Sequence, residues 1–252
     1  MDFFSLSDIP SLLTHLADGP VGISLFVFWL LNVLILGMAL GIGQLILRGY
    51  HQQIRPNRPK DWGIGMLTVS INALITQFGL YLYSLGYLQV DFVWQPSKFV
   101  LGLLGLFFAM DLFMFIFHYF IHQTKLHKII HSLHHQAMHP KPIDLFVLHP
   151  IETLGFGILF IGVLCCISFQ IHAILIYLML NVLFGIIGHL GFEPLKKWPK
   201  NKYSLLNYLG TSSFHHLHHE DLSCNFGFYT NLWDRLFGTY QKGEARGGNK
   251  MI

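Results

Sequence analysis

HYFIHQTKLHKIIHSLHH, residues 118–135, is the stretch that decides the fold. It contains two histidine patterns, H-x-x-x-H from His118 and H-x-x-H-H from His131. Residues three or four apart lie on one face of a helix, so each pattern directs its imidazoles to one side. Neutral imidazole is a common ligand for iron, copper and zinc. A second H-x-x-H-H begins at His215, and we expect the chain to fold so that these groups meet.

The composition is typical of a membrane protein. Of the 252 residues, 53% are hydrophobic and only 12% are charged, with a mean hydropathy of +0.50. Helices long enough to cross a hydrocarbon core of about 30 Å fit the apolar stretches, which are residues 21–47, 63–90, 99–120 and 151–190. The sequence predicts an all-α polytopic membrane protein, a single domain over 1–252, with about four transmembrane helices, the last two as a hairpin.

The charges predict how the chain sits in the membrane. Both histidine groups must reach one site, so the chain between them crosses the membrane an even number of times. Of the 16 Lys and Arg residues, all but Lys98 then fall on the histidine side. The positive-inside rule makes that side cytoplasmic. We expect the more polar residues 191–252 to form a helical cytoplasmic cap outside the bilayer, which carries a histidine-rich di-metal site.

The histidine patterns need a partner that uses their lone pairs. Imidazoles at a membrane edge are costly to desolvate, and they repel one another when protonated. A metal satisfies them, whereas the alternative is a set of interfacial polar residues or a proton sensor. Eight patterned histidines and His189 exceed what one ion can use, so two ions are expected. Cys165, Cys166 and Cys224 lack the spacing of a zinc site. A nitrogen-rich site with open positions suits dioxygen chemistry at iron.

Several motifs together resemble the fatty acid hydroxylase/sterol desaturase superfamily of membrane di-iron enzymes, and their spacing is most similar to that of the methylsterol oxidases. The resemblance covers about residues 104–240. The matching pieces are HYFIH at 118–122, HSLHH at 131–135, HPIETL at 149–154, GHLGFEPL at 188–195, FHHLHH at 214–219 and NFGFYTNLWDRLFGT at 225–239.

The resemblance implies two non-haem iron ions, with O₂ as co-substrate and electrons from an external donor. The implied iron ligands are His118, His122, His131, His134, His135, His189, His215, His218 and His219. His216 is excluded, because one step along a helix from His215 points it about 100° away.

Four further residues are candidates for orienting those ligands. Asp111 lies seven residues before His118, on nearly the same helix face, and could hold the N–H of a ligand imidazole. The alternative is a pair with a polar group such as Asn181. The other three candidates are Glu152, His149 and His127. We expect Trp233, Asp234 and Arg235 to lock the cap rather than take part in chemistry.

The predicted function is an O₂-dependent hydroxylation or desaturation of an unactivated C–H bond in a lipid, such as a sterol or a fatty acyl chain. No Rossmann glycine pattern occurs, so a separate reductase or electron carrier should dock on the basic face. No nucleic-acid partner is expected, and the motifs specify neither the lipid nor the oligomeric state. The membrane is a bacterial inner membrane or the endoplasmic reticulum.

Two other functions are compatible with a histidine-rich membrane protein. One is a non-enzymatic membrane protein, either a metal- or haem-binding electron carrier or a metal transporter. A transporter should carry its histidines along a path within the spans, whereas here they cluster at span ends. The other is a catalytically dead relative that senses lipids, which is disfavoured because no histidine pattern is broken.

Overall fold

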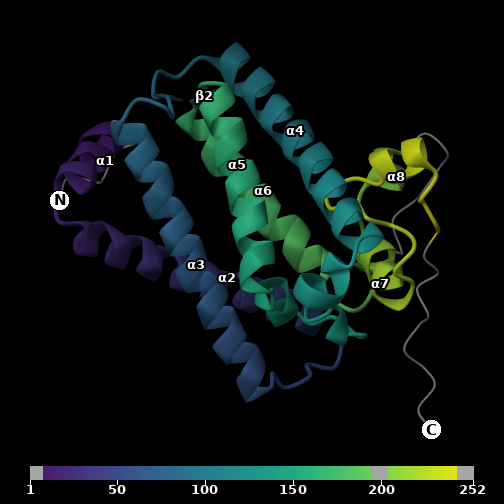
Figure 1. Cartoon of the computed structure of the whole chain (residues 1–252). Helices are drawn as coiled ribbons and strands as arrows, with labels where there is room; N and C mark the ends of the chain where they lie inside the picture. The colour runs from purple at the N-terminus through teal and green to yellow at the C-terminus, as the bar shows by residue number, and fades with distance from the viewer. Residues whose placement is uncertain (1–7, 195–203, 243–252) are drawn as a thin grey trace, which may run out of the picture.

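The computed structural model describes residues 8–194 and 204–242, and it confirms the predicted helical membrane architecture (Figure 1). The predicted tail charges at 195–203 and 243–252 lie outside the described residues. The α-helices are α1 (Ile9–Asp18), α2 (Val21–Gly49), α3 (Pro59–Ser84), α4 (Pro96–Gln123), α5 (Pro150–Cys166), α6 (Ile171–Gly188), α7 (Ser212–Glu220) and α8 (Leu232–Phe237). Shorter helical turns are η2 (His127–His131), η3 (His134–Gln136), η4 (Pro142–Phe146) and η6 (Leu205–Tyr208).

Four helices of the described chain are long and apolar enough to cross a membrane, namely α2, α3, α4 and α6. The chain is thus an integral membrane protein. The stretch predicted at 151–190 is divided into α5 and α6, and α5 is apolar but has only 17 residues. The break at 167–170 contains β2 (Phe169–Gln170), which pairs in parallel with β1 (Val90–Asp91). This pairing ties the α5–α6 connection to the loop before α4.

The second span begins earlier and ends earlier than predicted. It starts at Pro59 because Asp61 caps the helix, accepting a hydrogen bond from the backbone N–H of Arg58 at 3.1 Å. It ends at Ser84 because the chain turns through Gly86, whose φ of +77° favours glycine. Asp61 is fully buried and also binds Lys141 at 3.4 Å. That ion pair fixes the start of α3 to η4.

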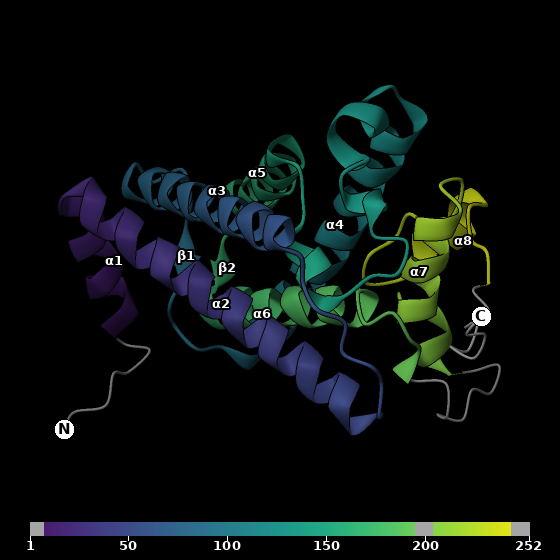
Figure 2. The same cartoon turned by 90° about the horizontal axis from the view of Figure 1, so that it is seen from below.

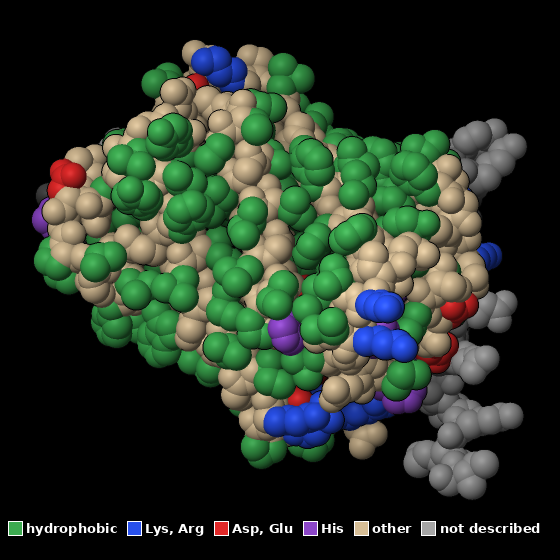
Figure 3. Space-filling model, in the orientation of Figure 1, with side chains coloured by type: hydrophobic (Ala, Val, Ile, Leu, Met, Phe, Trp, Pro, Cys, Tyr) green, Lys and Arg blue, Asp and Glu red, His purple; other side chains and the backbone are tan. Residues whose placement is uncertain are grey.

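Five helices form a closed ring of contacts in the order α2, α3, α5, α4, α6 and back to α2. Figures 1 and 2 show the five helices together, with α7 and α8 beside α4. Helix α1 packs on α2 and α3, far from α7 and α8. Apolar side chains cover much of the outer face of the spans, and Lys and Arg gather near one end (Figure 3). The ring therefore presents apolar side chains to lipid and gathers its histidines at the charged end.

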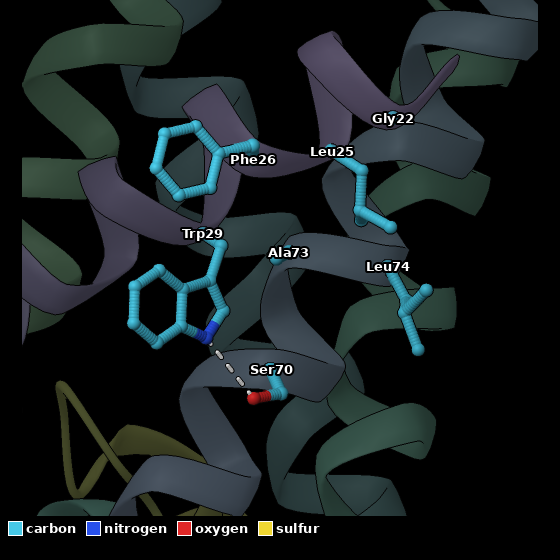
Figure 4. A pocket seen from close by; sticks show the side chains of 7 residues that line it. All are labelled: Gly22, Leu25, Phe26, Trp29, Ser70, Ala73 and Leu74. Atoms are coloured by element: carbon cyan, nitrogen blue, oxygen red, sulfur yellow. Dashed lines mark hydrogen bonds between the residues drawn. The ribbon is translucent and has the colours of Figure 1, made fainter.

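An apolar groove of about 360 Å³ lies between α2 and α3 (Figure 4). It is lined by Phe26 and Trp29 of α2 and by Ser70 and Ala73 of α3, among others. The indole Nε1 of Trp29 donates a hydrogen bond to Ser70 Oγ at 3.2 Å. No histidine lines this groove, so it is separate from the histidine patterns.

The loop that leads to α8 packs into the membrane-spanning core. Tyr229 is 1% exposed and shares one buried apolar cluster with Leu106, Met110 and Met114 of α4 and with Tyr177 of α6. Its hydroxyl contacts the Tyr177 hydroxyl at 2.9 Å. The predicted cap is thus not wholly separate from the spans, because one of its loops is part of their core.

Candidate metal centre

Nine histidines converge at the end of α4 in two adjacent groups. Each residue offers one ring nitrogen, and within each group these nitrogens lie within 4.8 Å of one another. The five-histidine cluster comprises His118, His122, His131, His135 and His218. The four-histidine cluster comprises His134, His189, His215 and His219. The structure brings together all nine residues that the sequence selected.

Each H-x-x-H-H pattern is divided between the two clusters. In the first pattern, His131 and His135 reach the five-histidine cluster, whereas His134 reaches the four-histidine cluster. This segment is not a regular α-helix, because a π-helical turn ends at His131 and a 3-10 turn begins at His134. In α7 the division is reversed, since only His218 reaches the five-histidine cluster. Each of the two patterns therefore supplies histidines to both clusters, so the two clusters are linked through the same short segments.

Hydrogen bonds fix which nitrogen of several rings carries the proton. His118 Nδ1 lies 2.8 Å from the carbonyl oxygen of Phe226, and His218 Nδ1 lies 2.7 Å from that of Cys224. A carbonyl oxygen only accepts, so both Nδ1 atoms donate. In the same way His189 Nδ1 donates to Gly185 O at 2.8 Å. Each of these neutral rings then presents a bare lone pair at Nε2.

The bare nitrogens face one another, which fits a cation. His118 Nε2 lies 3.1 Å from His218 Nε2 and 2.9 Å from His131 Nε2. In the four-histidine cluster, His189 Nε2 lies 3.3 Å from His215 Nε2. For His118, His131 and His218, whose Nδ1 atoms carry the proton, the Nε2 lone pairs repel at such distances, and an ion bound by the nitrogens removes the repulsion. The donor set therefore fits metal ions better than it fits hydrogen bonding.

Burial keeps the cap histidines neutral. It is the largest cause that lowers the pKa of His218 to about 3 and that of His215 well below its usual range. Some ring nitrogens are also buried without a hydrogen-bond partner among the described residues, including both nitrogens of His135. Buried polar atoms are normally satisfied. These orphaned nitrogens again point to a ligand that accepts their lone pairs.

Glu152 and His127 lie where the sequence places them, beside the five-histidine cluster. Glu152 Oε1 is 2.7 Å from His131 Nδ1, and both side chains are buried. The His127 ring centroid lies 4.7 Å from that of His122. Glu152 thus directs His131 Nε2 toward the cluster, as a carboxylate beside a metal-binding histidine does.

His149 and Asp111 differ from expectation, since neither is seen to hold a ligand histidine. His149 caps α5, where its Nδ1 accepts a hydrogen bond from the backbone N–H of Ile151 at 3.3 Å. The Asp111 carboxylate accepts bonds from the backbone N–H groups of Tyr229 and Thr230, at 3.0 and 3.1 Å. It also accepts from Thr230 Oγ1 at 2.5 Å and from Trp233 Nε1 at 3.0 Å. The loop before α8 therefore occupies the carboxylate that was expected to hold an imidazole.

The alternative for Asp111, a pair with a polar group of another helix, is met by Trp233 of α8 and not by Asn181. The side-chain oxygen of Asn181 instead accepts a hydrogen bond from the Tyr229 hydroxyl at 2.7 Å. His216 points away from both clusters, as expected, and its ring stacks on His139 with 5.6 Å between centroids.

Two buried carboxylates hold the loop whose carbonyls orient His118 and His218. Asp111 binds residues 229–233, and Asp234 accepts from the backbone N–H groups of Phe226 and Gly227, both at 2.8 Å. Sequence reasoning expected Trp233, Asp234 and Arg235 to lock the cap. These bonds confirm that for Trp233 and Asp234, and Arg235 does so by donating to the carbonyl oxygen of Asn207 at 3.2 Å. Sequence reasoning missed the carbonyls of Cys224 and Phe226, because every residue has a backbone oxygen and a residue pattern does not single one out.

Comparison with known proteins settles the family. A family model described as fatty acid hydroxylase matches residues 103–239, more than half of the chain and all nine histidines. The chain belongs to the fatty acid hydroxylase family. No solved structure matches it.

This member of the fatty acid hydroxylase family is similar in sequence to several named enzymes. It is 27% identical over 201 residues to methylsterol monooxygenase 1 of Gallus gallus, and the aligned region covers 74% of this chain and 65% of that protein. It is 30% identical over 154 residues to very-long-chain aldehyde decarbonylase GL1-5 of Oryza sativa subsp. indica, with 56% of this chain and 24% of that protein aligned. Methylsterol monooxygenase erg25B of Aspergillus fumigatus is 29% identical over 148 residues, covering 56% and 49%. The chain thus spans less than two thirds of the length of these relatives.

Proposed function

We propose that this protein is an O₂-dependent membrane oxidoreductase that hydroxylates or desaturates an unactivated C–H bond of a lipid. The observation that carries the proposal is the pair of histidine clusters, each with its nitrogens within 4.8 Å of one another. The names of its relatives point the same way, because one is a methylsterol monooxygenase and another a very-long-chain aldehyde decarbonylase. A sterol, a fatty acyl chain or a related lipid is the proposed substrate.

The nine histidines would hold two non-haem iron ions, one in each cluster. Iron bound there supplies the dioxygen chemistry, with electrons from an external donor. The chain's own residues orient the imidazoles and exclude water from the site. Glu152 and the carbonyls of Cys224 and Phe226 keep three imidazole N–H groups turned away from the five-histidine cluster.

Aromatic side chains cover one side of the five-histidine cluster. Phe226 is fully buried, and its ring centroid lies 5.2 Å from that of His122 and 5.9 Å from that of His118. Phe228 lies 5.4 Å from His118, and it packs on Phe156 of α5. A dry apolar wall suits a lipid substrate, and it protects a reactive centre from water.

The electron donor would approach from the histidine end. Exposed cations lie there, including Arg48, Arg55, Lys60, Lys125 and Lys128. Their sign favours a reductase or carrier with an acidic docking face. Under the positive-inside rule, the same charges support a cytoplasmic histidine end as part of this proposal. Metal transport is less well supported, because both clusters lie at one end of the spans rather than along them.

Metal analysis and lipid analysis together test the proposal. The purified wild-type chain, loaded with ferrous iron, should hold about two ions per chain without a haem absorption band. His134→Ala should hold less iron, whereas His139→Ala should match the wild type because exposed His139 belongs to neither cluster. Membrane lipids of cells that express the wild type should differ from those of cells with His134→Ala. Unchanged lipids with oxygen and reductant present would contradict the proposal.

A further inference from the structure

Helix α8 buries Asp234 against the cap and leaves its large apolar residues exposed. Asp234 is fully buried, bound to the backbone of Phe226 and Gly227. Arg235 Nε donates to Asn231 Oδ1 at 2.7 Å, and its guanidinium lies 3.9 Å from the centroid of the Tyr240 ring. The Arg235 side chain is exposed, and these contacts hold its charge against the cap beside the apolar residues.

The outward residues of α8 are large and exposed. Leu236 is 70% exposed and Phe237 is 60% exposed, and Leu232 is 39% exposed. Leaving such a side chain in water forgoes the favourable free energy of burying its apolar surface. Three of them on a helix of six residues therefore call for an apolar partner.

The position of α8 along α4 identifies that partner. Phe237 stacks on Phe115 with 5.5 Å between ring centroids, and Trp233 donates to Asp111. At about 1.5 Å per residue, Phe115 and Asp111 lie about 12 Å and about 18 Å from Gln123 along the helix. α4 has 28 residues and is about 42 Å long. It exceeds a hydrocarbon core of about 30 Å by about 12 Å.

This arithmetic places α8 at the level of the bilayer. Even if the whole excess of α4 projects from the membrane at the histidine end, Phe115 lies at the hydrocarbon boundary and Asp111 inside it. Figure 1 agrees, since α8 lies alongside the second half of α4 and α7 lies nearer its end. Exposed Ile116 and Phe120 of α4 carry the apolar surface of the span to the same level.

We propose that α8 is embedded in the bilayer, with Leu232, Leu236 and Phe237 among the acyl chains of the leaflet at the histidine end. The occupant of this face is lipid because the face continues the lipid-facing surface of α4. A second copy of the chain or another protein would leave that continuity unexplained. The loop that orients His118 and His218 is then held between α4 and the membrane. This inference needs only the membrane-spanning character of α4 and does not depend on bound metal.

Spin labels at single cysteines test the depth of α8. In a chain with Cys165→Ala and Cys166→Ala, the label would be placed at Leu236→Cys, with Leu232→Cys as a second site should the first misfold. Cys224 is 1% exposed, and burial raises its thiol pKa to about 12, so it should not react. Ile158→Cys, 60% exposed on α5, is the lipid-facing control, and Lys242→Cys, exposed in the cap, is the water-facing control.

The full-length variants would be reconstituted at one chain per phosphatidylcholine–phosphatidylglycerol nanodisc. We expect the α8 label to collide with oxygen and to avoid a water-soluble nickel chelate, as the Ile158→Cys label does. Collision with the nickel chelate at the level of Lys242→Cys would overturn the proposal. A label shielded from both reagents would also overturn it, because protein rather than lipid would then cover the face.

Discussion

The two histidine clusters use similar ligands but are supported in different ways. In the five-histidine cluster, three rings have their N–H held from outside, by Glu152 and by the carbonyls of Cys224 and Phe226. In the four-histidine cluster, such a bond is found for His189, to a carbonyl of its own helix. Bonds from distant segments therefore orient the first cluster. In the second, three of the four histidines lie on or directly after α6 and α7, which pack against each other, and His134 comes from η3.

Accessibility separates the clusters as well. His122 in the five-histidine cluster is only partly buried, whereas all four members of the other cluster are buried. Partly buried His127 lies against His122. We therefore expect the five-histidine cluster to exchange its metal first, and to be the one that a change in the loop at residues 224–233 disturbs.

Alanine in place of one ligand should give the largest effect, and α7 offers a matched pair. His218→Ala should empty the five-histidine cluster and His215→Ala the four-histidine cluster, since each removes one ligand nitrogen. Each variant should keep about one ion and lose more than about 100-fold in activity. Metal content and the visible spectrum of the Co²⁺-loaded protein measure this. His216→Ala, on the same helix, is the control. Equal loss of both ions in each variant would show that the clusters are not independent.

Asp111→Ala should weaken the five-histidine cluster without touching a histidine. It frees the loop at residues 229–233, so the carbonyls of Cys224 and Phe226 no longer hold their imidazoles in place. We expect a 10- to 100-fold loss of metal affinity there, the usual effect of removing an outer support, and little change in the other cluster. Competition with a chelator measures the affinity of each site.

Asp61→Asn is the control for that loss. Asp61 is likewise a fully buried carboxylate in a span, but it binds Arg58 and Lys141 rather than the loop. It should lower stability with no preference between clusters. The same selective loss of metal in Asp61→Asn would contradict a specific role for Asp111.

Glu152→Gln should have a smaller effect, confined to the same cluster. The amide oxygen can still accept the hydrogen bond from His131 Nδ1, but it cannot supply the negative charge that a carboxylate would carry beside a bound cation. About a tenfold loss of metal affinity is expected. Glu152→Ala should lose more than Glu152→Gln, and the reverse order would show that the carboxylate does not support His131.

Acid should destabilise the metal-free protein through a property that both clusters share. Burial lowers the pKa of His218 to about 3, whereas the unfolded chain has the ordinary value of about 6.5. Between these values the unfolded state binds more protons, so stability falls as the pH drops below about 6.5. Each such histidine lowers the free energy of unfolding by up to about 1.4 kcal/mol for each pH unit of that drop. Unfolding midpoints from pH 8 to pH 5 measure the slope, which His218→Gln should reduce. A flat profile would contradict burial of neutral rings.

Local patterns in the sequence predicted the spans and the nine histidines. The division of the histidines between clusters was not predictable, because it depends on a switch from π-helical to 3-10 geometry between His131 and His134. The role of Asp111 was hidden for another reason. Its partners lie more than a hundred residues away, and a residue spacing reports only the face on which Asp111 sits.

Anomalous diffraction at the iron edge from the iron-loaded protein tests the central claim most directly. Two peaks are predicted, one among the ring nitrogens of His118, His122, His131, His135 and His218 and the other among those of His134, His189, His215 and His219. A single peak, or peaks outside these two sets of nitrogens, would contradict the account.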